Sequence, residues 1–363
     1  MSLLLSREKN PFFEHAEAEY FLAERGAEVV GRIAAISNRL HNETHGDRVG
    51  FFGFFECVDD QAVADALLDA AAAWCRNKGH DVLRGPASFS VNDECGLLVD
   101  GFETPPTLMM PHNPRYYVAL LERAGFAKAK DLLVYQGGHP TRYKPVPERL
   151  TRATEVIRQR MGITLRPLDM KNFEREVESI KELYNANWEK NWGFVPMTEH
   201  EIDHLAEQFK PVVVPTMVPM AEKDGKIIGF GLALPDLNVV FRGNRSGRMF
   251  PVVLKLLWAL KMKRIRRARI LLLGVLPEYR GKGVDAMVAS GRTAARPSPI
   301  CASNGPPRTG ASILAVSLVH AGGVPAGPEP QVCKAREVGR PLRRPGLPDV
   351  HGDRRRRTSL EGR

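Results

Sequence analysis

The chain has 363 residues, of which 43% are hydrophobic and 26% charged, the balance of a globular protein with enough apolar material for substantial cores. No apolar run approaches the roughly 18 residues of a membrane span, and the apolar stretch after Met1 is too short for a signal peptide. The five cysteines form no C-x-x-C pair, which disfavours a zinc ribbon or a disulfide framework and makes a cytoplasmic protein the expectation.

The formal charge of +10 belongs mostly to the C-terminal end of the chain. Residues 291–363 hold 12 Arg, one Lys and five acidic residues, hence +8, together with ten Pro, ten Gly and no aromatic residue. Such a composition predicts a disordered tail over residues 289–363. Arg, Pro and Gly are also what GC-rich coding sequence yields out of frame. We therefore favour a departure from the native reading frame near residues 287–290 over a native basic tail.

The body of the chain divides into two halves that repeat one pattern. We expect a first domain over residues 1–136, a linker over 137–150 and a second domain over 151–288. A strand–turn–strand pattern occurs at residues 23–31 and recurs 198 residues later at 221–229. Because an apolar strand and then a helix follow each hairpin, the sequence indicates duplication of one α/β unit.

Periodicity and turn signals predict the other elements in chain order. In the first half they predict the strand Val49–Glu56, the helix Asp60–Lys78 and the strand Asp131–Gln136. In the second half they predict the strand Thr164–Leu168, the helices Phe173–Trp188, Glu199–Phe209 and Met249–Arg267, the strand Ile270–Leu276 and a helix that begins near Arg280.

The segment 270–284 is the most informative in the chain. An apolar strand breaks at Pro277 and leads through a turn of sequence R-G-K-G, residues 280–283, into a helix. The first turn of a helix has unpaired backbone N–H groups and a dipole that favours anions, and glycines let a phosphate approach the backbone. The residues therefore predict a pyrophosphate-binding strand–turn–helix, to which Arg280 and Lys282 add positive charge.

The string V-x-P-x-Y-R-G-K-G resembles motif A of the GNAT (Gcn5-related) N-acetyltransferases, and with its two hairpins the body resembles a tandem GNAT protein. The resemblance implies an α/β fold of tandem GNAT-like mixed sheets with flanking helices. It also implies transfer of an acetyl group from acetyl-CoA, the co-substrate, to a small-molecule or peptide amine of unknown identity.

The resemblance also implies the residues that hold the co-substrate. Those implied for the pyrophosphate are Arg280, Gly281, Lys282, Gly283 and Val284. Those implied for the pantetheine arm are Leu273, Gly274 and Val275. The sequence departs from the motif at Asp285, where the family has Gly or Ala, and no catalytic residue is assigned.

The first half resembles a degenerate copy of the same unit. At the position of the glycine turn it has Asp59 and Asp60, so we expect no pyrophosphate site there. The stretch from Asn113 to Phe126 resembles the ending of a GNAT domain. The hairpin begins only some 16 residues from Met1, which indicates a domain shortened at its N-terminus.

The second domain is expected to be incomplete. The strand that should face Ile270–Leu276 across the cofactor falls in the tail, so one wall of the cleft would be missing and an apolar strand edge would be exposed. This predicts weak or absent acetyltransferase activity for the chain.

The stretch His200–His204 spells H-E-x-x-H, the zinc-binding pattern of a class of proteases. A structural interpretation is better, because Thr198 and Glu201 have the spacing of a helix-capping box and no third ligand is evident. We therefore expect no metal site.

Three further features admit both a functional and a structural interpretation. The side chains of Trp188, Trp192 and Phe194 would either line an acceptor pocket or pack in the core. The loop Asn92–Gly96 would supply carboxylates to a cationic acceptor, but a solvated loop is the better interpretation. The basic helix Leu254–Arg267 fits a membrane surface, the 3′-phosphate of CoA or an ordinary cation-rich helix end.

Two other functional classes stay open beside acetyl transfer. One is a non-catalytic CoA-sensing module, and the other is nucleic-acid binding through the basic tail, especially Arg354–Arg357. The near-neutral body disfavours nucleic acid as a partner. A homo-oligomer is compatible with the sequence, which does not fix the oligomeric state.

Overall fold

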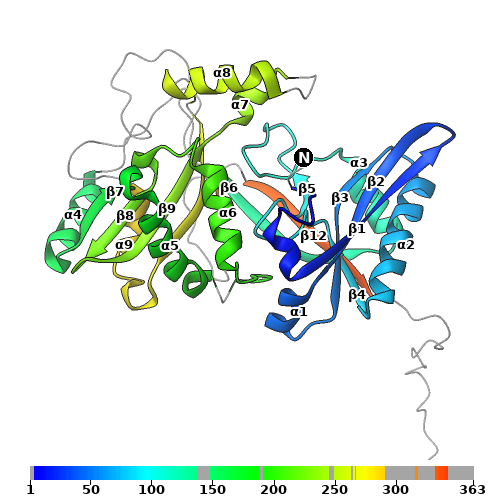
Figure 1. The fold of residues 1–363 in the computed structure, drawn as a ribbon, viewed down its shortest axis with the longest axis horizontal. Helices are drawn as coiled ribbons and strands as arrows, with labels where there is room; N and C mark the ends of the chain where they lie inside the picture. Colours follow the sequence, from blue (N-terminus) through cyan, green and yellow to red (C-terminus); the bar gives the residue numbers. More distant parts are fainter. Residues whose placement is uncertain are drawn as a thin grey trace, which may run out of the picture.

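The structure is a computed structural model that describes residues 4–136, 148–188, 191–244, 249–262, 265, 267–290, 315–317 and 332–341. Its two halves lie side by side, and each is built of strands with helices packed against them (Figure 1). Within these ranges no helix combines the length and the apolar character needed to cross a membrane.

The first half is a mixed sheet with helices against it. Its elements are η1 (Pro11–Glu14), β1 (Ala16–Arg25), β2 (Glu28–Asn38), α1 (Arg39–His45), β3 (Val49–Cys57), α2 (Gln61–Asn77), β4 (Val82–Gly85), β5 (Leu97–Asp100), α3 (Tyr116–Arg123) and β6 (Ala127–Gln136). Strands β1, β2 and β3 pair antiparallel in chain order, and β3 pairs parallel with β4. A parallel pair needs a crossover connection, which α2 provides.

The second half repeats the antiparallel part of this arrangement. Its elements are α4 (Glu148–Met161), β7 (Thr164–Pro167), η2 (Met170–Asn172), α5 (Phe173–Trp188), α6 (Glu199–Phe209), η3 (Pro215–Met217), β8 (Pro219–Lys223), β9 (Lys226–Pro235), α7 (Asn238–Phe241), α8 (Met249–Lys261), β10 (Ala268–Val275), η4 (Pro277–Tyr279) and α9 (Val284–Ser290). Strands β7 to β10 pair antiparallel in chain order. Helices α5 and α6 pack on one face of these strands, and α9 and α4 pack on the other.

The predicted α/β class and the tandem mixed sheets with flanking helices are confirmed. Both hairpins form, and α5 and α6 have the predicted limits. Helix α8 ends at Lys261, six residues before the predicted limit. Helix α9 begins only at Val284, because Gly281 and Gly283 have a left-handed backbone that a right-handed helix cannot include. The domain limits stay predictions.

Helix α4 is absent from the sequence-based prediction, which extends the linker to residue 150. Its sequence is mostly polar, although its few apolar residues, among them Ala153, Ile157 and Met161, recur at helical spacing. Ile157 and Met161 pack against the buried face of α9, beside Val284 and Met287. This helix is stabilised by a neighbour that lies more than a hundred residues away in the sequence, which no local pattern reveals.

Two segments of the tail pair with the sheet. Strand β11 (Ala315–Ser317) lies between β10 and β6, and β12 (Val332–Pro341) lies between β6 and β4. Over these segments the structure differs from the expected disordered tail. The physical reason is that an open strand edge offers N–H and C=O groups to any backbone, whatever its side chains. The other residues of 291–363, including Arg354–Arg357, lie outside the described residues.

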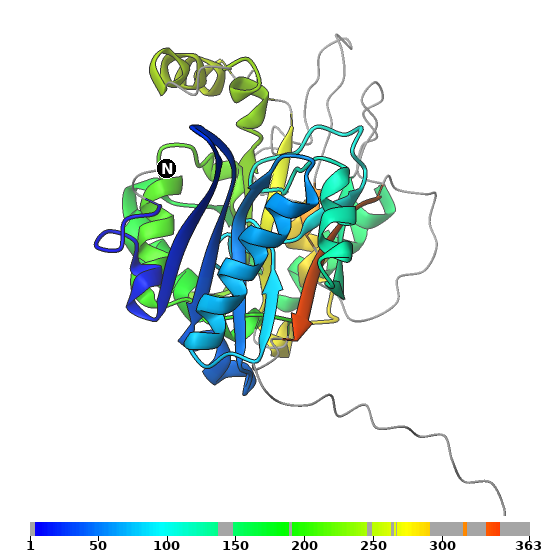
Figure 2. The same cartoon turned by 90° about the vertical axis from the view of Figure 1, so that its right-hand side faces the viewer.

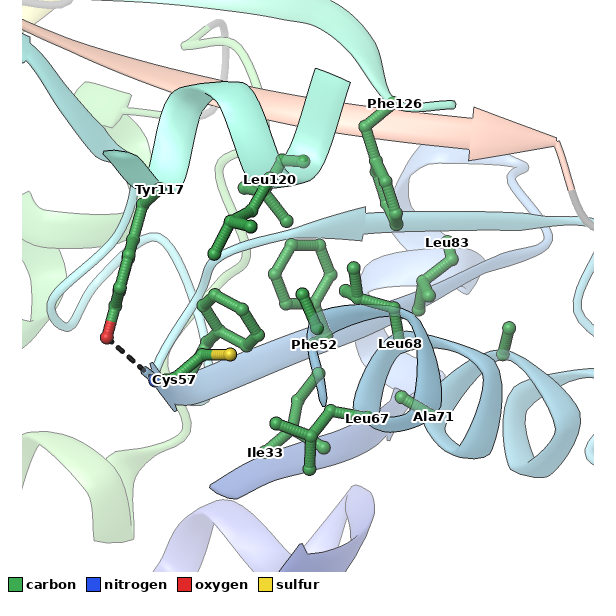
Figure 3. Close-up of a cluster of buried hydrophobic side chains, with 14 of the residues drawn as sticks. Ile33, Phe52, Cys57, Leu67, Leu68, Ala71, Leu83, Tyr117, Leu120 and Phe126 are labelled. Carbon is green, nitrogen blue, oxygen red and sulfur yellow. Dashed lines mark hydrogen bonds between the residues drawn. The ribbon is translucent and has the colours of Figure 1, made fainter. Parts of the chain in front are cut away.

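A close-packed aromatic core fills the first half. Phe52 of β3 is fully buried with Leu68 of α2 and Leu83 of β4. Figure 3 shows these side chains converging between the sheet and the helices. In the same cluster the backbone N–H of Cys57 donates to the hydroxyl of Tyr117 at 2.9 Å, which joins the end of β3 to α3.

Replacing Tyr117 by Phe removes the acceptor of the buried Cys57 N–H while the ring is kept. An unsatisfied buried donor costs about 1–3 kcal/mol, so we expect a loss of that size in the free energy of unfolding, measured with urea. Tyr20→Phe on the outer strand β1 is the matched control and should stay within about 0.5 kcal/mol of the wild type. Equal stability of the two variants would show that the hydrogen bond contributes nothing.

Candidate functional site

The turn between β10 and α9 has the backbone geometry that an anion site needs. Gly281 and Gly283 have φ values of +67° and +79°, the left-handed region that favours glycine. A Cβ at Gly281 would meet no atom within 4 Å, so the backbone there is open. The first backbone N–H that bonds inside α9 is that of Met287, which donates to Gly283. Among the described residues, the three preceding N–H groups have no backbone acceptor, so they can donate to an external one.

The side chain of Arg280 fixes this turn in place. Its guanidinium donates to the backbone oxygen of Val275 at 3.1 Å, and to the backbone and side-chain oxygens of Asn187 at 3.2 and 3.1 Å. Arg280 thus connects the end of β10 to the end of α5. Its hydrogen bonds are directed at the protein, whereas the resemblance implies contact with the pyrophosphate.

Two lysines lie near one aromatic ring of the turn. The Nζ atoms of Lys282 and Lys223 each lie 5.7 Å from the centroid of the Tyr279 ring. Lys223 ends strand β8 and is absent from the sequence-based site. No linear signal marks Lys223, because Lys223 reaches the turn only through the pairing of β8 with β9 and of β9 with β10. The fold therefore adds a second cation to the one that the motif supplies.

The edge of strand β10 that leads to this turn is paired only at its start among the described residues. Its pairing with β11 covers only Arg269 and Ile270. Its register with β9 is interrupted between Ile270 and Leu272 by a bulge, a device that bends a strand. Among the described residues no strand pairs with the β11 side of β10 beyond Ile270. The start of the strand, at Arg269 and Ile270, is thus covered, and an open edge from residue 271 to 275 stays a prediction.

Of the three aromatic residues predicted for an acceptor pocket, Trp188 and Phe194 both pack on the ring of Tyr184 in one core cluster. Trp188 stacks on Tyr184 at 4.9 Å, and a Cβ at Gly274 would lie 2.7 Å from its ring. Phe194 is a core residue with 4% of its surface exposed. Trp192 lies under the guanidinium of Arg84, 5.4 Å from the ring centroid, at the junction of the halves. Trp188 thus lies against Gly274 of β10.

The loop Asn92–Gly96 of the first half contacts the second half through Asn92, whereas Glu94 is exposed, so the interpretation as a solvated loop holds only in part. The side-chain amide of Asn92 donates to the backbone oxygen of Val195 at 3.1 Å. The hydroxyl of Tyr184 donates to the side-chain oxygen of Asn92 at 3.2 Å. This loop is anchored because it bonds to a partner that is distant in sequence, which local polarity cannot reveal.

Within this loop Asp93 is a carboxyl in an unusual environment. Its side chain accepts from the hydroxyl of Ser90 at 3.0 Å. Burial raises the pKa of Asp93 to about 6, and the nearby charge of Glu201 raises the pKa further against the opposing effect of Ser90. Burial also raises the pKa of Tyr184, with the charge of Asp93 as the next cause. Asp93 therefore titrates near neutrality beside the ring that stacks on Trp188.

The H-E-x-x-H stretch is a structural helix start, as expected. Thr198 and Glu201 form both hydrogen bonds of a capping box. His200 pairs with Glu14 at 2.9 Å and Glu201 with His15 at 3.2 Å, so these side chains hold the first half against α6. In the described part of the chain no three His, Cys, Asp or Glu residues are grouped to hold a metal ion.

The corresponding turn of the first half is closed by its own carboxylate. Asp60 caps α2 by accepting from the N–H of Ala62 at 2.9 Å, and it pairs with Arg25 at 2.6 Å. The hydrogen bond from Arg25 and then that from Ala62 lower the pKa of Asp60. A bound anion would need the place that this carboxylate occupies. The carboxylate of Asp60 is therefore a physical reason to expect no pyrophosphate site at this turn.

Two α/β halves in tandem, the second with a strand that ends in the glycine turn of motif A, define a protein of the tandem GNAT class. Solved structures with similar folds include a tandem GNAT protein from the clavulanic acid biosynthesis pathway, with 12% identity, a TM-score of 0.47 and coverage of 92% of this chain and 85% of that one. A GCN5-related N-acetyltransferase from Anabaena variabilis ATCC 29413 has 14% identity, a TM-score of 0.40 and coverage of 89% and 63%.

Two relatives match at much higher identity. Protein YghO of Escherichia coli (strain K12) is 36% identical over 283 residues, which are 77% of this chain and 71% of that protein. The bacterial ceramide synthase of Caulobacter vibrioides (strain NA1000 / CB15N) is 39% identical over 277 residues, 76% of this chain and 71% of that protein. The chain belongs to the family of these two proteins. A scan of protein-family models found no match.

The effect of the contact between α4 and the glycine turn on stability can be measured. A Cβ at residue 283 would lie 2.6 Å from Cδ1 of Ile157, in a left-handed backbone. We expect Gly283→Ala to cost about 2–4 kcal/mol in unfolding free energy, the sum of backbone strain and overpacking. In an Ile157→Val background, which lacks Cδ1, this cost should fall by about 1 kcal/mol or more.

Gly281→Ala is the control for that double-mutant cycle. Its backbone is also left-handed, but its Cβ would meet nothing within 4 Å. It should therefore lose only the backbone term of about 1–2 kcal/mol, with the same value in both backgrounds. A Gly283→Ala cost that Ile157→Val leaves unchanged would mean that α4 does not contact the turn in solution.

Proposed function

We propose that this chain is an N-acyltransferase that takes an acyl group from a CoA thioester and forms an amide with an amine. The single observation that carries the proposal is the turn at residues 280–284. Left-handed glycines, free helix N–H groups and two lysines meet there at the end of a strand whose edge is predicted to be open. This is the chemistry that recognises a pyrophosphate next to an extended arm.

In this proposal the residues of the turn have different roles in binding CoA. The backbone of Gly281 to Val284, with Lys282 and Lys223, holds the pyrophosphate. Arg280 keeps the turn in shape through Val275 and Asn187. The pantetheine arm lies along Leu273, Gly274 and Val275, where an extended chain finds backbone N–H and C=O groups to bond. The open left-handed backbone at Gly281 fits a bound phosphate, because no Cβ stands in the way.

The reaction is a direct transfer. The neutral amine nitrogen attacks the thioester carbonyl carbon, the carbon–sulfur bond breaks, and CoA leaves as a thiol after gaining a proton. The nitrogen loses a proton to a base as the amide forms. N–H groups on the edge of β10 are available to polarise the carbonyl oxygen where negative charge develops.

We assign the role of base to Asp93 of the first half. Support comes from its position beside Tyr184, whose ring stacks on Trp188 against Gly274. Support also comes from its pKa of about 6, which suits a group that must take a proton near neutral pH. The degenerate half would then supply the proton acceptor while the second half binds the thioester.

The acceptor and the acyl group follow from the Caulobacter relative. That relative is named a bacterial ceramide synthase. A ceramide is the amide of a long-chain amino alcohol with a fatty acid, so we propose a long-chain amine as acceptor and a fatty acyl-CoA as donor, with acetyl-CoA as the smaller alternative. We expect slow turnover in this chain, because β11 covers only two residues of the edge that a full strand would follow.

Binding of CoA to the turn should depend on both lysines. We expect Lys282→Gln and Lys223→Gln each to raise the dissociation constant of CoA about threefold to tenfold, as a lost charge-assisted contact does, in calorimetry at low salt. The exposed Lys171 on η2 is the control and should have no effect. The same losses should appear with 3′-dephospho-CoA. If they vanish with that ligand, the lysines contact the 3′-phosphate and not the pyrophosphate.

Replacing Asp93 by Asn should reduce turnover about 100-fold, the usual contribution of a general base. Because a base acts when ionised, the wild-type rate should rise as the pH passes through about 6, and the variant should lack this limb. The measurement is thiol release from palmitoyl-CoA and acetyl-CoA with a long-chain amine. Asp100→Asn, an exposed control, should keep the wild-type profile.

Thermal stability separates this role from a structural one. A carboxyl whose folded-state pKa is raised stabilises the fold below its unfolded pKa, and this contribution is lost as the pH rises through about 6. Asp93→Asn should therefore melt at a higher temperature than the wild type at pH 8, with a smaller difference at pH 5. A variant that melts at a lower temperature than the wild type at pH 8 and keeps the wild-type pH profile of the rate would contradict the assignment of Asp93 as the base.

A further inference from the structure

Helix α8 exposes a broad apolar face. Phe250 is 74% exposed, Leu254 55% and Leu257 51%, and Val253 and Met262 are exposed beside them. The opposite face, with Val252, Leu256 and Ala259, is buried. At about 100° per residue the exposed apolar residues spread over nearly half of the helix circumference. Apolar residues thus lie on both faces of α8, and the face with Phe250, Leu254 and Leu257 is exposed.

The helix stands away from the body of the protein. It rests on the short helix α7 and projects from the end of the second half (Figure 1). The view turned by 90° shows it clear of the sheet and of the other helices (Figure 2). Contiguous exposed apolar surface marks an interaction site. The face presented by α8 therefore needs a partner.

The charge around α8 defines the chemistry of that partner. Residues 242–267 contain nine Lys or Arg and no Asp or Glu. Arg242, Lys255 and Lys261 belong to this segment and are exposed. Two copies of so cationic a face would repel each other, which argues against self-association. An apolar face with a border of cations matches an anionic lipid surface, where lipid chains and headgroups satisfy both.

We propose that α8 is a membrane-docking helix that lies in the interfacial region of an anionic lipid bilayer. Phe250, Leu254 and Leu257 enter the boundary between headgroups and acyl chains, and Lys255 and Lys261 contact anionic headgroups. The 13 residues of α8 extend about 20 Å, which is too short for a hydrocarbon core of about 30 Å, so the helix lies along the surface.

Docking in this way orients the candidate site. Strand β10 begins seven residues after α8, and the glycine turn follows its other end. Eight residues of strand extend about 26 Å. The start of β10 then lies near the lipid, and the phosphate-binding turn lies about that distance from α8. This last consequence rests on the proposed function, whereas the docking itself does not.

The test is flotation of the full chain with vesicles of phosphatidylcholine containing about 30% phosphatidylglycerol, a typical anionic surface. The protein should float with these vesicles, not with pure phosphatidylcholine, and less at high salt. The triple variant Phe250→Ser, Leu254→Ser, Leu257→Ser should lose at least tenfold in partitioning. The matched control replaces Leu22, Val29 and Val156, which are 62%, 55% and 60% exposed elsewhere, by Ser and should bind as the wild type.

Contrary results would point to a different partner for this face or to a different part of the chain. Binding that the triple variant keeps would overturn the proposal, because the basic tail would then be responsible. A wild-type dimer that the triple variant loses, without vesicle binding, would assign the face to a second copy and overturn it too.

A second variant and two measurements keep the test decisive. Circular dichroism checks that each variant folds. Lys255→Glu with Lys261→Glu should weaken binding to anionic vesicles while the apolar face stays intact, since only the headgroup contacts are reversed in sign. Calorimetry with CoA should be unchanged in all these variants, so a failed docking test leaves the proposed function standing.

Discussion

The hydrogen bonds of one guanidinium determine the shape of the candidate site. Arg280 joins the end of β10, through Val275, to the end of α5, through Asn187. A glycine-rich turn has many accessible conformations, and such a turn binds an anion well only when something else fixes it. Once it is fixed, the free N–H groups of α9 point in a constant direction. Lys223 and Lys282 then meet at Tyr279, and Trp188 closes over Gly274.

The first half illustrates what happens to the same unit without this constraint. Its turn carries Asp60, which caps α2 and pairs with Arg25, so the helix N-terminus has an internal anion. Its interior is filled by aromatic and aliphatic side chains around Phe52 (Figure 3). The first half carries the loop of Asp93 to the junction, where Asn92 bonds to Val195.

Much of the fold was predictable because its signals are local. The capping box of Thr198 and Glu201 places the start of α6, and apolar periodicity places α2 and α5. The glycine turn was predictable because a left-handed backbone needs glycine. Helix α4, Lys223 and the packing of Asn92 were not predictable, since each depends on a neighbour brought close by the sheet.

The sequence by itself determined the α/β class, the duplicated hairpins, the strand–turn–helix at residues 270–284 and the confinement of the positive charge to the tail and to the segment before β10. These follow from residue type and short-range spacing. Only the tertiary structure decided that Arg280 bonds to the protein and that Trp188 lies against Gly274 of β10. It also decided that the surroundings of Asp93 raise the pKa of this carboxyl to about 6, and that one apolar face of α8 is exposed. Burial and long-range pairing are properties of the packed chain. They set the energies of charges and apolar surfaces, whereas the sequence only identifies the residues that carry them.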